Sequence, residues 1–586
     1  MRRTLFALAL CLLSVPASWA QAARPYLDLD FEAPECTNQW RRSGQWWFPY
    51  ENAVVGSEAR SGQQSLRVKY LSPFPWSTQA GSGVMLQQLL PMWVAGKRVR
   101  FSGWIRTEAV TTGYAGLWWT ALTGPGTGAG VNMAANGPRG TTGWSPYEVS
   151  LDIPANATTI FFGVELRGNG TAWFDDLAVE VDGRRLPEGP VPQLLEPTPE
   201  HAAWLSANAM PFDTPVAGNG FADLQGLKTA IGDARIVSLG EGTHGTREFF
   251  QMKHRLLEFL VEEMGFTHFS IEASMPEAYR VNDYVLTGQG DPYELLEGMY
   301  FWTWNTREVL DMILWMRQYN VSGKGPVQFT GFDMQASPVA IENARAFLTL
   351  ADPGYLPQAE TAFAKVAAAD ARFQATPDDV AAARGLFGYM SGRRADYLVA
   401  GFPEGDVDWA IQNARILVQL VESLAGITRR DKSMADNAAW ILDHAPAGSK
   451  IVLWAHNGHV RKLPGFMGGY LDERYGEDQY VLGFAYEEGS YTAVGPLGLG
   501  THATIPPPPG SLETFLGSAG IPRYILDLRS LDEDAPGAWL KTWQRMKSIG
   551  AVALRCEGFF PTNAADEYDG LIWIESTSPS VRLPFD

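Results

Sequence analysis

The chain has 586 residues, roughly three times the length of a typical domain, so we expect more than one folding unit. Its 46% hydrophobic and 19% charged residues exclude a mainly disordered chain. The formal charge of −19 disfavours nucleic-acid binding, because an acidic surface repels phosphate and no basic residues cluster along the sequence. The three cysteines, Cys11, Cys36 and Cys556, are too few for a disulfide scaffold and have no zinc-binding spacing, and whether Cys36 and Cys556 pair stays open.

Residues 1–20 are typical of a secretory signal peptide. Arg2 and Arg3 form a basic start, residues 5–15 an apolar core, and residues 18–20 a small-x-small cleavage site before Gln21. The apolar core is too short to span a bilayer, and no later stretch reaches about 18 uninterrupted apolar residues. We therefore expect an exported protein, periplasmic or secreted, without a membrane span; an uncleaved anchor is the alternative.

Residues 24–183 consist of short runs with period-two alternation, such as SLRVKYL and YEVSLDI, separated by turn residues. This pattern predicts an antiparallel β-sandwich. The opening YLDLDFE and the closing AWFDDLAVEVDG resemble the first and last strands of a galactose-binding-like jelly roll, a fold common in carbohydrate-binding modules. That resemblance implies a glycan as one candidate partner of the sandwich.

Aromatic and acidic residues of the sandwich offer two candidate ligand sites. Tryptophans can stack on sugar rings, although we expect most of the ten in this region to be core residues. A group of acids near the first and last strands could hold a structural Ca²⁺ or be simply solvated. These acids are Asp28, Asp30, Glu32, Asp175 and Asp176.

Residues 184–204 are Pro-rich and predict a linker, after which the pattern changes. From residue 205 to 586, nearly continuous apolar runs such as RIVSLGE, THFSIEA and KIVLWAH alternate with segments of helical periodicity. This predicts an α/β domain, a mainly parallel sheet flanked by helices. The Ala-rich stretch at about 340–447 predicts a helical insertion in it.

Chemically versatile side chains follow the predicted strands, at the edge where ligands gather in open parallel sheets. RIVSLG is followed by Glu241 and His244, and THFSI by Glu272. The later strands are followed by Asp333, by His456 and His459, and by Glu487. The chain has only eight histidines, so their concentration at these exits indicates a catalytic site.

The turn after the first of these strands also matches a dinucleotide fingerprint, Gly240-x-Gly242-x-x-Gly245. Glu241 and His244 would stand where an anionic pyrophosphate must approach bare backbone, which disfavours a nicotinamide cofactor. The helix predicted after it would instead direct its N-terminal N–H groups to a carboxylate or an oxyanion beside His244.

Six ordered blocks, GEGTHGTREF, FSIEA, FWTWNTREVLDMILWMRQYN, GFDMQ, RDKSMADNAAWIL and WAHNGHV, resemble the erythromycin esterase family from about residue 205 to the C-terminus. The resemblance implies an α/β sheet with helical additions and water-mediated ester hydrolysis, including the opening of macrolactones. The catalytic histidine of the family falls on His244, its acids on Glu241 and Glu272, and its second histidine on His456. A basic residue of the first helix, often Arg, is Lys253 here.

The residue types support ester hydrolysis independently of the family resemblance. His244 can activate water, Glu241 or Glu272 can fix its tautomer, and the oxyanion can be stabilised by His456, by Lys253 or by the helix N-terminus. Further candidates for substrate or oxyanion contacts are Lys253, Arg247, Asp333 and His459. No cofactor is expected, but a divalent metal bound by His244, His456, Glu241 and Glu272 is an alternative. Arg430, Asp431, Met434 and Asn437 are interpreted as helix-packing residues.

We therefore predict an exported hydrolase that cleaves carboxylic esters or lactones by His-activated water. The alternative is a carbohydrate- or envelope-binding protein with an inactive esterase-like domain. A macrolide, with a role in antibiotic resistance, is one candidate substrate, and a native ester, lactone or sugar-linked acyl group is another. The absence of GxSxG, SxxK and HExxH motifs disfavours a serine nucleophile or a thermolysin-like zinc helix.

Overall fold

A computed structural model describes residues 27–32, 40–43, 50–71, 82–89, 91–124, 127–186, 196–495, 498–529, 531, 536–554 and 558–584. The predicted signal peptide, the three cysteines and residues 187–195 of the predicted linker lie outside this part of the chain. Among the described residues, no helix combines the length and the apolar character needed to cross a membrane.

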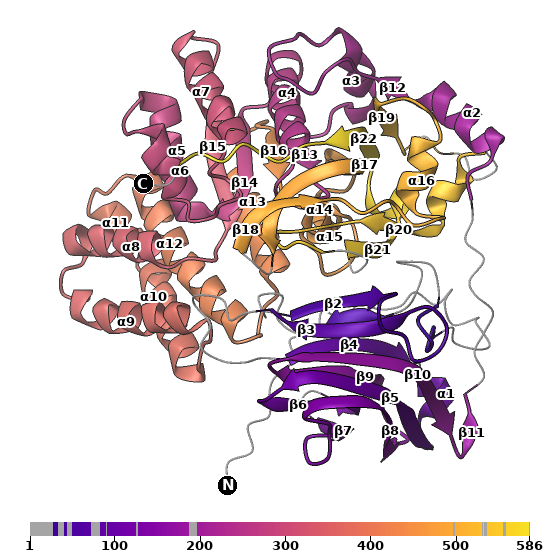
Figure 1. Ribbon diagram of the computed structural model, residues 1–586. Helices are drawn as coiled ribbons and strands as arrows, with labels where there is room; N and C mark the ends of the chain where they lie inside the picture. The colour runs from indigo at the N-terminus through magenta and orange to yellow at the C-terminus, as the bar shows by residue number, and fades with distance from the viewer. Residues whose placement is uncertain are drawn as a thin grey trace.

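The N-terminal region is a sandwich of two antiparallel sheets, as predicted (Figure 1). One sheet has the order β1-β4-β9-β6-β7: Arg41–Ser43, Ser82–Leu89, Thr159–Gly168, Gly113–Gly124 and Thr127–Asn132. The other has the order β2-β3-β10-β5-β8: Tyr50–Val55, Ser65–Tyr70, Thr171–Val181, Arg98–Val110 and Gly140–Asp152, with β11 (Arg184–Arg185) beside β10. The short helix α1 (Pro91–Val94) follows β4. Alternate side chains meet between the sheets, where the rings of Phe101 and Trp119 pack edge-on or tilted against Phe162.

Two tryptophans of the second sheet are covered by arginine. The guanidinium carbon of Arg60 lies 3.8 Å from the ring centroid of Trp104, and that of Arg106 lies 4.9 Å from the ring of Trp173. A sugar ring stacking on either indole would have to displace a cation that already holds the ring face. Glycan binding by the sandwich stays a prediction.

The acidic residues proposed as a calcium site bind N–H groups instead. Asp175 accepts from the backbone N–H groups of Arg60 and Ser61, and Glu32 accepts from those of Gln63 and Gln64. Within the described ranges, no three His, Cys, Asp or Glu side chains are placed to hold a metal ion. N–H donors thus occupy oxygens of Asp175 and Glu32 that a cation would need, and a structural Ca²⁺ stays a prediction.

The second domain is built on one large sheet of order β12-β19-β22-β17-β13-β16-β14-β15. These strands are Met210–Pro211, Arg523–Asp527, Gly570–Thr577, Gln479–Gly495, Ile236–Leu239, Ile451–Trp454, His268–Ser274 and Gln328–Asp333. Neighbours from β22 to β15 are parallel, β12 and β19 are antiparallel, and β18 (Gly498–Ala503) pairs with β17. A separate hairpin joins β20 (Trp543–Lys547) to β21 (Phe559–Asn563). The prediction of a mainly parallel α/β sheet is confirmed.

Helices cover both faces of this sheet because its strands are apolar on both sides. Val237 and Leu239 of β13 point into one core, whereas Ile236 points into the other. The first core is covered by α3 (Gln225–Ile231), α4 (Arg247–Met264), α5 (Met275–Thr287) and α7 (Arg307–Val321). The second is covered by α8 (Pro338–Ala351), α9 (Leu356–Arg372), α10 (Pro377–Gly392), α12 (Glu404–Leu424), α13 (Arg430–His444), α15 (Met467–Tyr475) and α16 (Leu512–Gly517).

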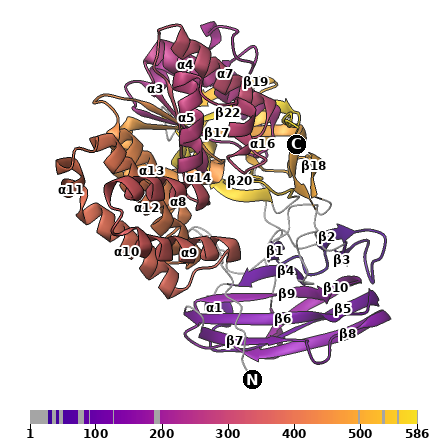
Figure 2. The ribbon, with the colours of Figure 1, turned by 90° about the vertical axis from the view of Figure 1, so that its left-hand side faces the viewer.

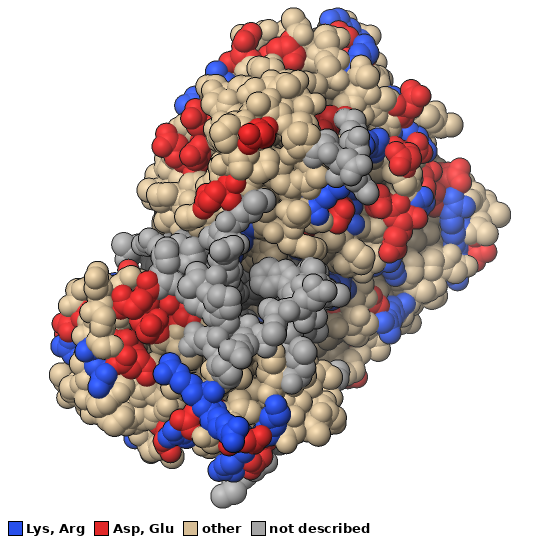
Figure 3. Space-filling model, turned by 90° about the vertical axis from the view of Figure 1, so that its right-hand side faces the viewer, with Lys and Arg blue, Asp and Glu red and all other residues tan. Residues whose placement is uncertain are grey.

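Between β15 and β16 the chain forms the helices α8 to α13, which extend to one side of the sheet (Figures 1 and 2). The remaining helices are α2 (Pro199–Asn208), α6 (Pro292–Glu297), α11 (Arg394–Val399), α14 (Asn457–Val460) and α17 (Ala564–Glu567). In both views the sandwich lies beneath the sheet. On the face of Figure 3, basic and acidic side chains lie intermingled, consistent with ion pairs such as Arg98–Asp152.

Candidate active site

Four adjacent strands, in the order β13-β16-β14-β15, bring the predicted residues together at their carboxyl ends. Glu241 and His244 follow β13, Glu272 lies in β14, Asp333 ends β15, and His456 and His459 follow β16. The chain enters β16 about 180 residues after β14 yet inserts it between β13 and β14. His456 therefore lies beside His244 although the two residues are far apart in the sequence.

The turn from β13 to α4 is held by close packing, which explains two of its glycines. A Cβ on Gly240 would lie 2.2 Å from Oδ1 of Asn457, and one on Gly245 would lie 2.0 Å from the carbonyl oxygen of Thr492. Both glycines therefore allow other parts of the protein to pack closely against the backbone of this turn. The turn is not built as a dinucleotide-binding loop. Thr246 precedes α4 as its N-cap, but its hydroxyl bonds to that of Thr243 and does not cap the helix.

Glu241 and His244 form a hydrogen-bonded dyad. Oε1 of Glu241 lies 2.6 Å from Nδ1 of His244, while Oε2 accepts from Nζ of Lys253 at 2.5 Å and from Nε1 of Trp454 at 2.8 Å. Because the carboxylate is held as an acceptor by two other donors, the third contact assigns the proton to Nδ1 of His244. Nε2 of His244 then carries the free lone pair, on a side chain that is 12% exposed.

His456 has the opposite tautomer. Its Nδ1 accepts from the backbone N–H of Gly458 at 3.1 Å, as the N-cap of α14, so the neutral ring carries its proton on Nε2. Burial, followed by the two neighbouring imidazoles, lowers the pKa of His456 well below its ordinary value, against the opposing effect of Glu272 and the backbone of Ile549. Its ring centroid lies 5.0 Å from that of His244. A lone pair and an N–H donor thus stand on neighbouring rings.

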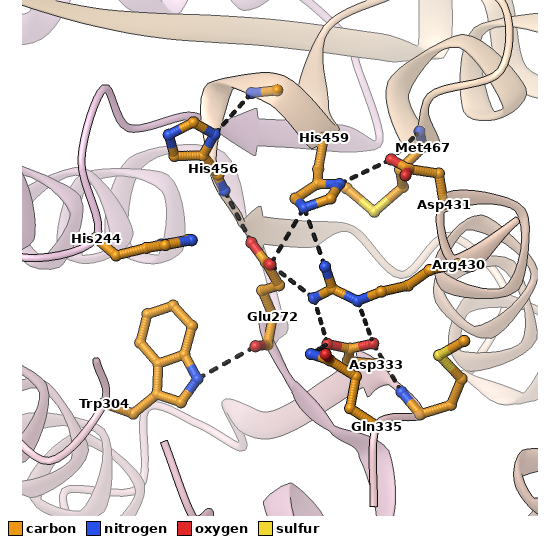
Figure 4. A network of polar contacts seen from close by, with 12 residues as sticks. His244, Glu272, Trp304, Asp333, Gln335, Arg430, Asp431, His456, His459 and Met467 are labelled. Carbon is orange, nitrogen blue, oxygen red and sulfur yellow. Dashed lines mark hydrogen bonds and ion pairs between the residues drawn. The ribbon is translucent and has the colours of Figure 1, made fainter. Parts of the chain in front are cut away.

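Glu272 is the centre of a second polar network (Figure 4). Its Oε2 accepts from the backbone N–H of His456 at 3.0 Å, and its Oε1 accepts from Nη2 of Arg430 at 2.7 Å. Nε2 of His459 is 3.3 Å from the same Oε1, and Nδ1 of His459 is 2.8 Å from Asp431. Arg430 also holds Asp333 with two N–H groups, one of them at 3.0 Å.

The charges in this network shift the pKa values of its members. Burial alone raises the pKa of the Glu272 carboxyl, but His459, Arg430, His244 and the N–H of His456 outweigh it and hold that pKa far below its usual range. Burial likewise lowers the pKa of His459, yet Glu272 and Asp431 outweigh it and raise that pKa overall. The network therefore favours an ionised Glu272 with Arg430 as its cationic partner.

Three predicted substrate contacts are placed elsewhere. Lys253 is fully buried behind Glu241, so it acts on that carboxylate and cannot contact a substrate; burial lowers its pKa to about 8 against the opposing effect of Glu241. Arg247 stands outside both networks, with its half-exposed side chain 3.5 Å from Glu308. Asp333 is fully buried and is held by Arg430, the N–H of Met334 and Gln335, which makes it a positioning group.

The helix-packing interpretation missed two residues of this polar network. Arg430 and Asp431 begin α13 and reach Glu272, Asp333 and His459, while Asn437 does serve packing through bonds to Phe332, Gln412 and Gln419. The available signal was electrostatic: two acids at neighbouring strand ends require a cation, and the Arg-Asp pair heads a predicted helix.

The carboxylates are not arranged as metal ligands. Both oxygens of Glu241 and both of Glu272 already accept from protein donors. No group of three His, Cys, Asp or Glu side chains with metal-binding placement occurs in the described ranges, and the alternative set of His244, His456, Glu241 and Glu272 does not fit a resident metal.

The family model described as erythromycin esterase matches residues 261–577, more than half of the chain. The chain belongs to the erythromycin esterase family. Membership of this family supports a hydrolase of the esterase type.

The relatives share the α/β domain at modest identity. The putative hydrolase YbfO of Bacillus subtilis (strain 168) is 26% identical over 426 residues, which cover 65% of this chain and 92% of that protein. The erythromycin esterase type II of Escherichia coli is 24% identical over 439 residues, which cover 64% of this chain and 98% of that protein. A Bacillus cereus protein of known crystal structure superposes with a TM-score of 0.60 at 28% identity, over 66% of this chain and 98% of that one.

Proposed function

We propose that this member of the erythromycin esterase family is an exported hydrolase that cleaves carboxylic esters or lactones with water activated by His244. The observation that carries the proposal is the pair of opposite tautomers: a free Nε2 lone pair on His244 beside an Nε2–H donor on His456. Export rests on the signal-like residues 1–20.

In the proposed reaction, Nε2 of His244 takes a proton from water as the water oxygen attacks the ester carbonyl carbon. Glu241, held by Lys253 and Trp454, accepts from Nδ1 and stabilises the imidazolium that forms. The Nε2–H of His456 donates to the oxyanion of the tetrahedral intermediate. When the intermediate collapses, the C–O bond to the alcohol breaks and the imidazolium returns its proton to the leaving alkoxide.

The second network holds His456 in position for this reaction. Glu272 holds the backbone N–H of His456, and Arg430 and His459 hold Glu272. The position of the donor imidazole is thereby coupled to an ionised carboxylate with fixed partners. The exposed fractions of Arg430 and His459, 25% and 21% of their side chains, leave them open to polar groups of a substrate.

The test is a hydrolysis screen of residues 21–586 against aryl esters, simple lactones and macrolides, with and without a chelator. We expect turnover that His244→Gln reduces by about 10³-fold. The matched control is His444→Gln, because His444 is a surface histidine stacked on Trp440 and should leave turnover unchanged.

Retained turnover in His244→Gln would contradict the proposal. Binding on a glycan array without hydrolysis of any ester would favour the alternative, a binding protein with an inactive esterase-like domain.

A further inference from the structure

Residues 548–554, which follow β20, lie beside the ring of His244, and we call them the roof segment. The N–H of Ile549 donates to the carbonyl of Gly242 at 2.6 Å, and Ile549 pairs with Thr243 in a parallel bridge. Further along, the N–H of Val494 in β17 donates to Ala551, and that of Ala553 donates back to Val494. The roof segment is thus tied to the turn that carries Glu241 and His244.

Buried hydrogen bonds fix the start of the roof segment. The backbone N–H of Lys547 donates to Oε1 of Glu513 at 2.6 Å, and its Nζ donates to the carbonyl of Glu487 at 2.8 Å. Lys547 and Glu513 are 1% and 0% exposed, so moving this strand would break hydrogen bonds of buried polar groups. The roof segment therefore cannot move aside cheaply.

Gly550 of the roof segment has no structural need to be glycine. Its φ lies outside the left-handed region that favours glycine. Gly265 and Gly288, which end helices, do have a φ in that region. A Cβ built on Gly550 would lie 3.7 Å from Cδ2 and 3.9 Å from Nε2 of His244, both ordinary contact distances. Within 4 Å it would meet no other atom of the described residues.

The contrast with Gly240 and Gly245 is informative. Those two glycines admit no Cβ because backbone or buried side-chain oxygens lie within about 2.2 Å. At Gly550, backbone conformation and packing both permit a side chain. Among the described residues, the group that a Cβ would contact is the imidazole of His244, at Cδ2 and at the adjacent Nε2.

We propose that Gly550 is a specificity-determining residue, whose missing side chain keeps open the space beside Nε2 of His244 for the substituents of the ester carbonyl. The inference rests on the proposed function and names its substrate class: esters and lactones with a branched α-carbon. The carbonyl carbon must lie within reach of a water on Nε2, and in this proposal its α-substituents extend past the backbone of Gly550. An alanine there removes room for about one methyl group, and a leucine covers the nitrogen itself.

The first experiment compares Gly550→Ala and Gly550→Leu with the wild-type protein on an acetate ester and on an α-branched ester of the same alcohol. We expect Gly550→Ala to lower kcat/KM at least ~10-fold for the branched ester and under ~3-fold for the acetate. Gly550→Leu should lose both. Gly143→Ala and Gly143→Leu are the matched controls, because Gly143 lies on strand β8 of the sandwich with open space around it and no left-handed φ.

The second experiment needs no ester substrate. Diethyl pyrocarbonate acylates neutral imidazoles, and peptide mass spectrometry gives the rate at which His244 is modified, with His244→Gln as the reference that lacks the product. We expect Gly550→Leu to slow this modification at least ~10-fold while the melting temperature stays within ~3 °C of wild type.

The outcomes separate the two claims. If wild type hydrolyses esters but Gly550→Ala and Gly550→Leu keep its preference between the acetate and branched substrates, the inference about Gly550 is overturned. If no ester is hydrolysed, the proposed function fails, and the modification rate decides about Gly550. Unchanged modification of His244 in Gly550→Leu overturns the inference whether or not the protein is an esterase.

Discussion

Glu241 and Glu272 bind the two neighbouring histidines, His244 and His456, in different ways. Glu241 binds the ring of His244 through Nδ1, whereas Glu272 binds the backbone N–H of His456 and leaves its ring alone. The first contact fixes a protonated Nδ1 and a free Nε2, while Gly458 takes Nδ1 of the second ring and leaves its proton on Nε2. Similar pairs of residues thus give one base and one donor, and the partner of each Nδ1 makes the difference.

The largest expected effect comes from breaking the ring contact. Glu241→Gln removes the charge that stabilises the imidazolium of His244, so we expect kcat/KM to fall by about 10³-fold or more. It also leaves Lys253 buried without its counter-ion, which lowers stability. Steady-state kinetics and thermal unfolding measure the two effects.

The double variant Glu241→Gln with Lys253→Met separates them, because it removes both buried charges together. It should recover part of the melting temperature and none of the activity. Recovery of activity in the double variant would contradict the assignment of Glu241 to His244.

A smaller effect is expected from removing the donor ring. His456→Asn keeps a side chain that can accept from the N–H of Gly458, since Asn is a favoured N-cap, but it lacks the Nε2–H donor. We expect kcat to fall by about 10²-fold with little change in KM, because the lost bond forms only in the transition state. Arg247→Ala is the control, as Arg247 lies outside both networks. A KM effect without a kcat effect would place His456 in ground-state binding instead.

The carboxyl of Glu277 provides a contrast with Glu241 and Glu272, because no histidine and no cation binds it among the described residues. Glu277 in α5 is 2% exposed, and both of its oxygens lack a hydrogen-bond partner among the described residues. Burial, reinforced by Asp370 and opposed by Arg280 and nearby backbone N–H groups, raises its pKa to about 8. Unlike Glu241 and Glu272, this carboxyl favours the neutral form.

The raised pKa of Glu277 determines how the stability of the protein changes with pH. Because the pKa of Glu277 is higher in the folded protein, its contribution to stability is present below about pH 4.5 and is lost as the pH rises through about 8. Glu277→Gln cannot ionise, so its free energy of unfolding should lie within about 1 kcal/mol of wild type at pH 5 and exceed wild type by about 5 kcal/mol at pH 9. Denaturant unfolding at the two pH values measures the difference, and equal stability at pH 9 would show that folding does not raise the pKa of Glu277.

The sequence predicted the parts of the site that depend on local patterns. His244, Glu241, Glu272, His456 and His459 follow apolar strands closely in the chain, and parallel strands end at one edge of a sheet, so their meeting could be inferred. The positions of Lys253 and Arg247 relative to the dyad could not be inferred from the sequence. Both residues lie in the first two turns of α4, and only the packing of the helix decides which of them is directed at Glu241. The network around Arg430 depends on how the insertion docks, over a sequence distance of 158 residues to Glu272.

The sequence by itself determined the fold class, the order of the domains and the identity of the strand-end residues, since these follow from hydrophobic periodicity and short spacings. Only the tertiary structure decided the tautomers, the burial of Lys253, the cation of the second network and the closeness of Gly550 to His244. Each of these depends on atoms brought together from distant parts of the chain, and hydrogen-bond partners and free space are properties of that assembly, which no spacing in the sequence encodes.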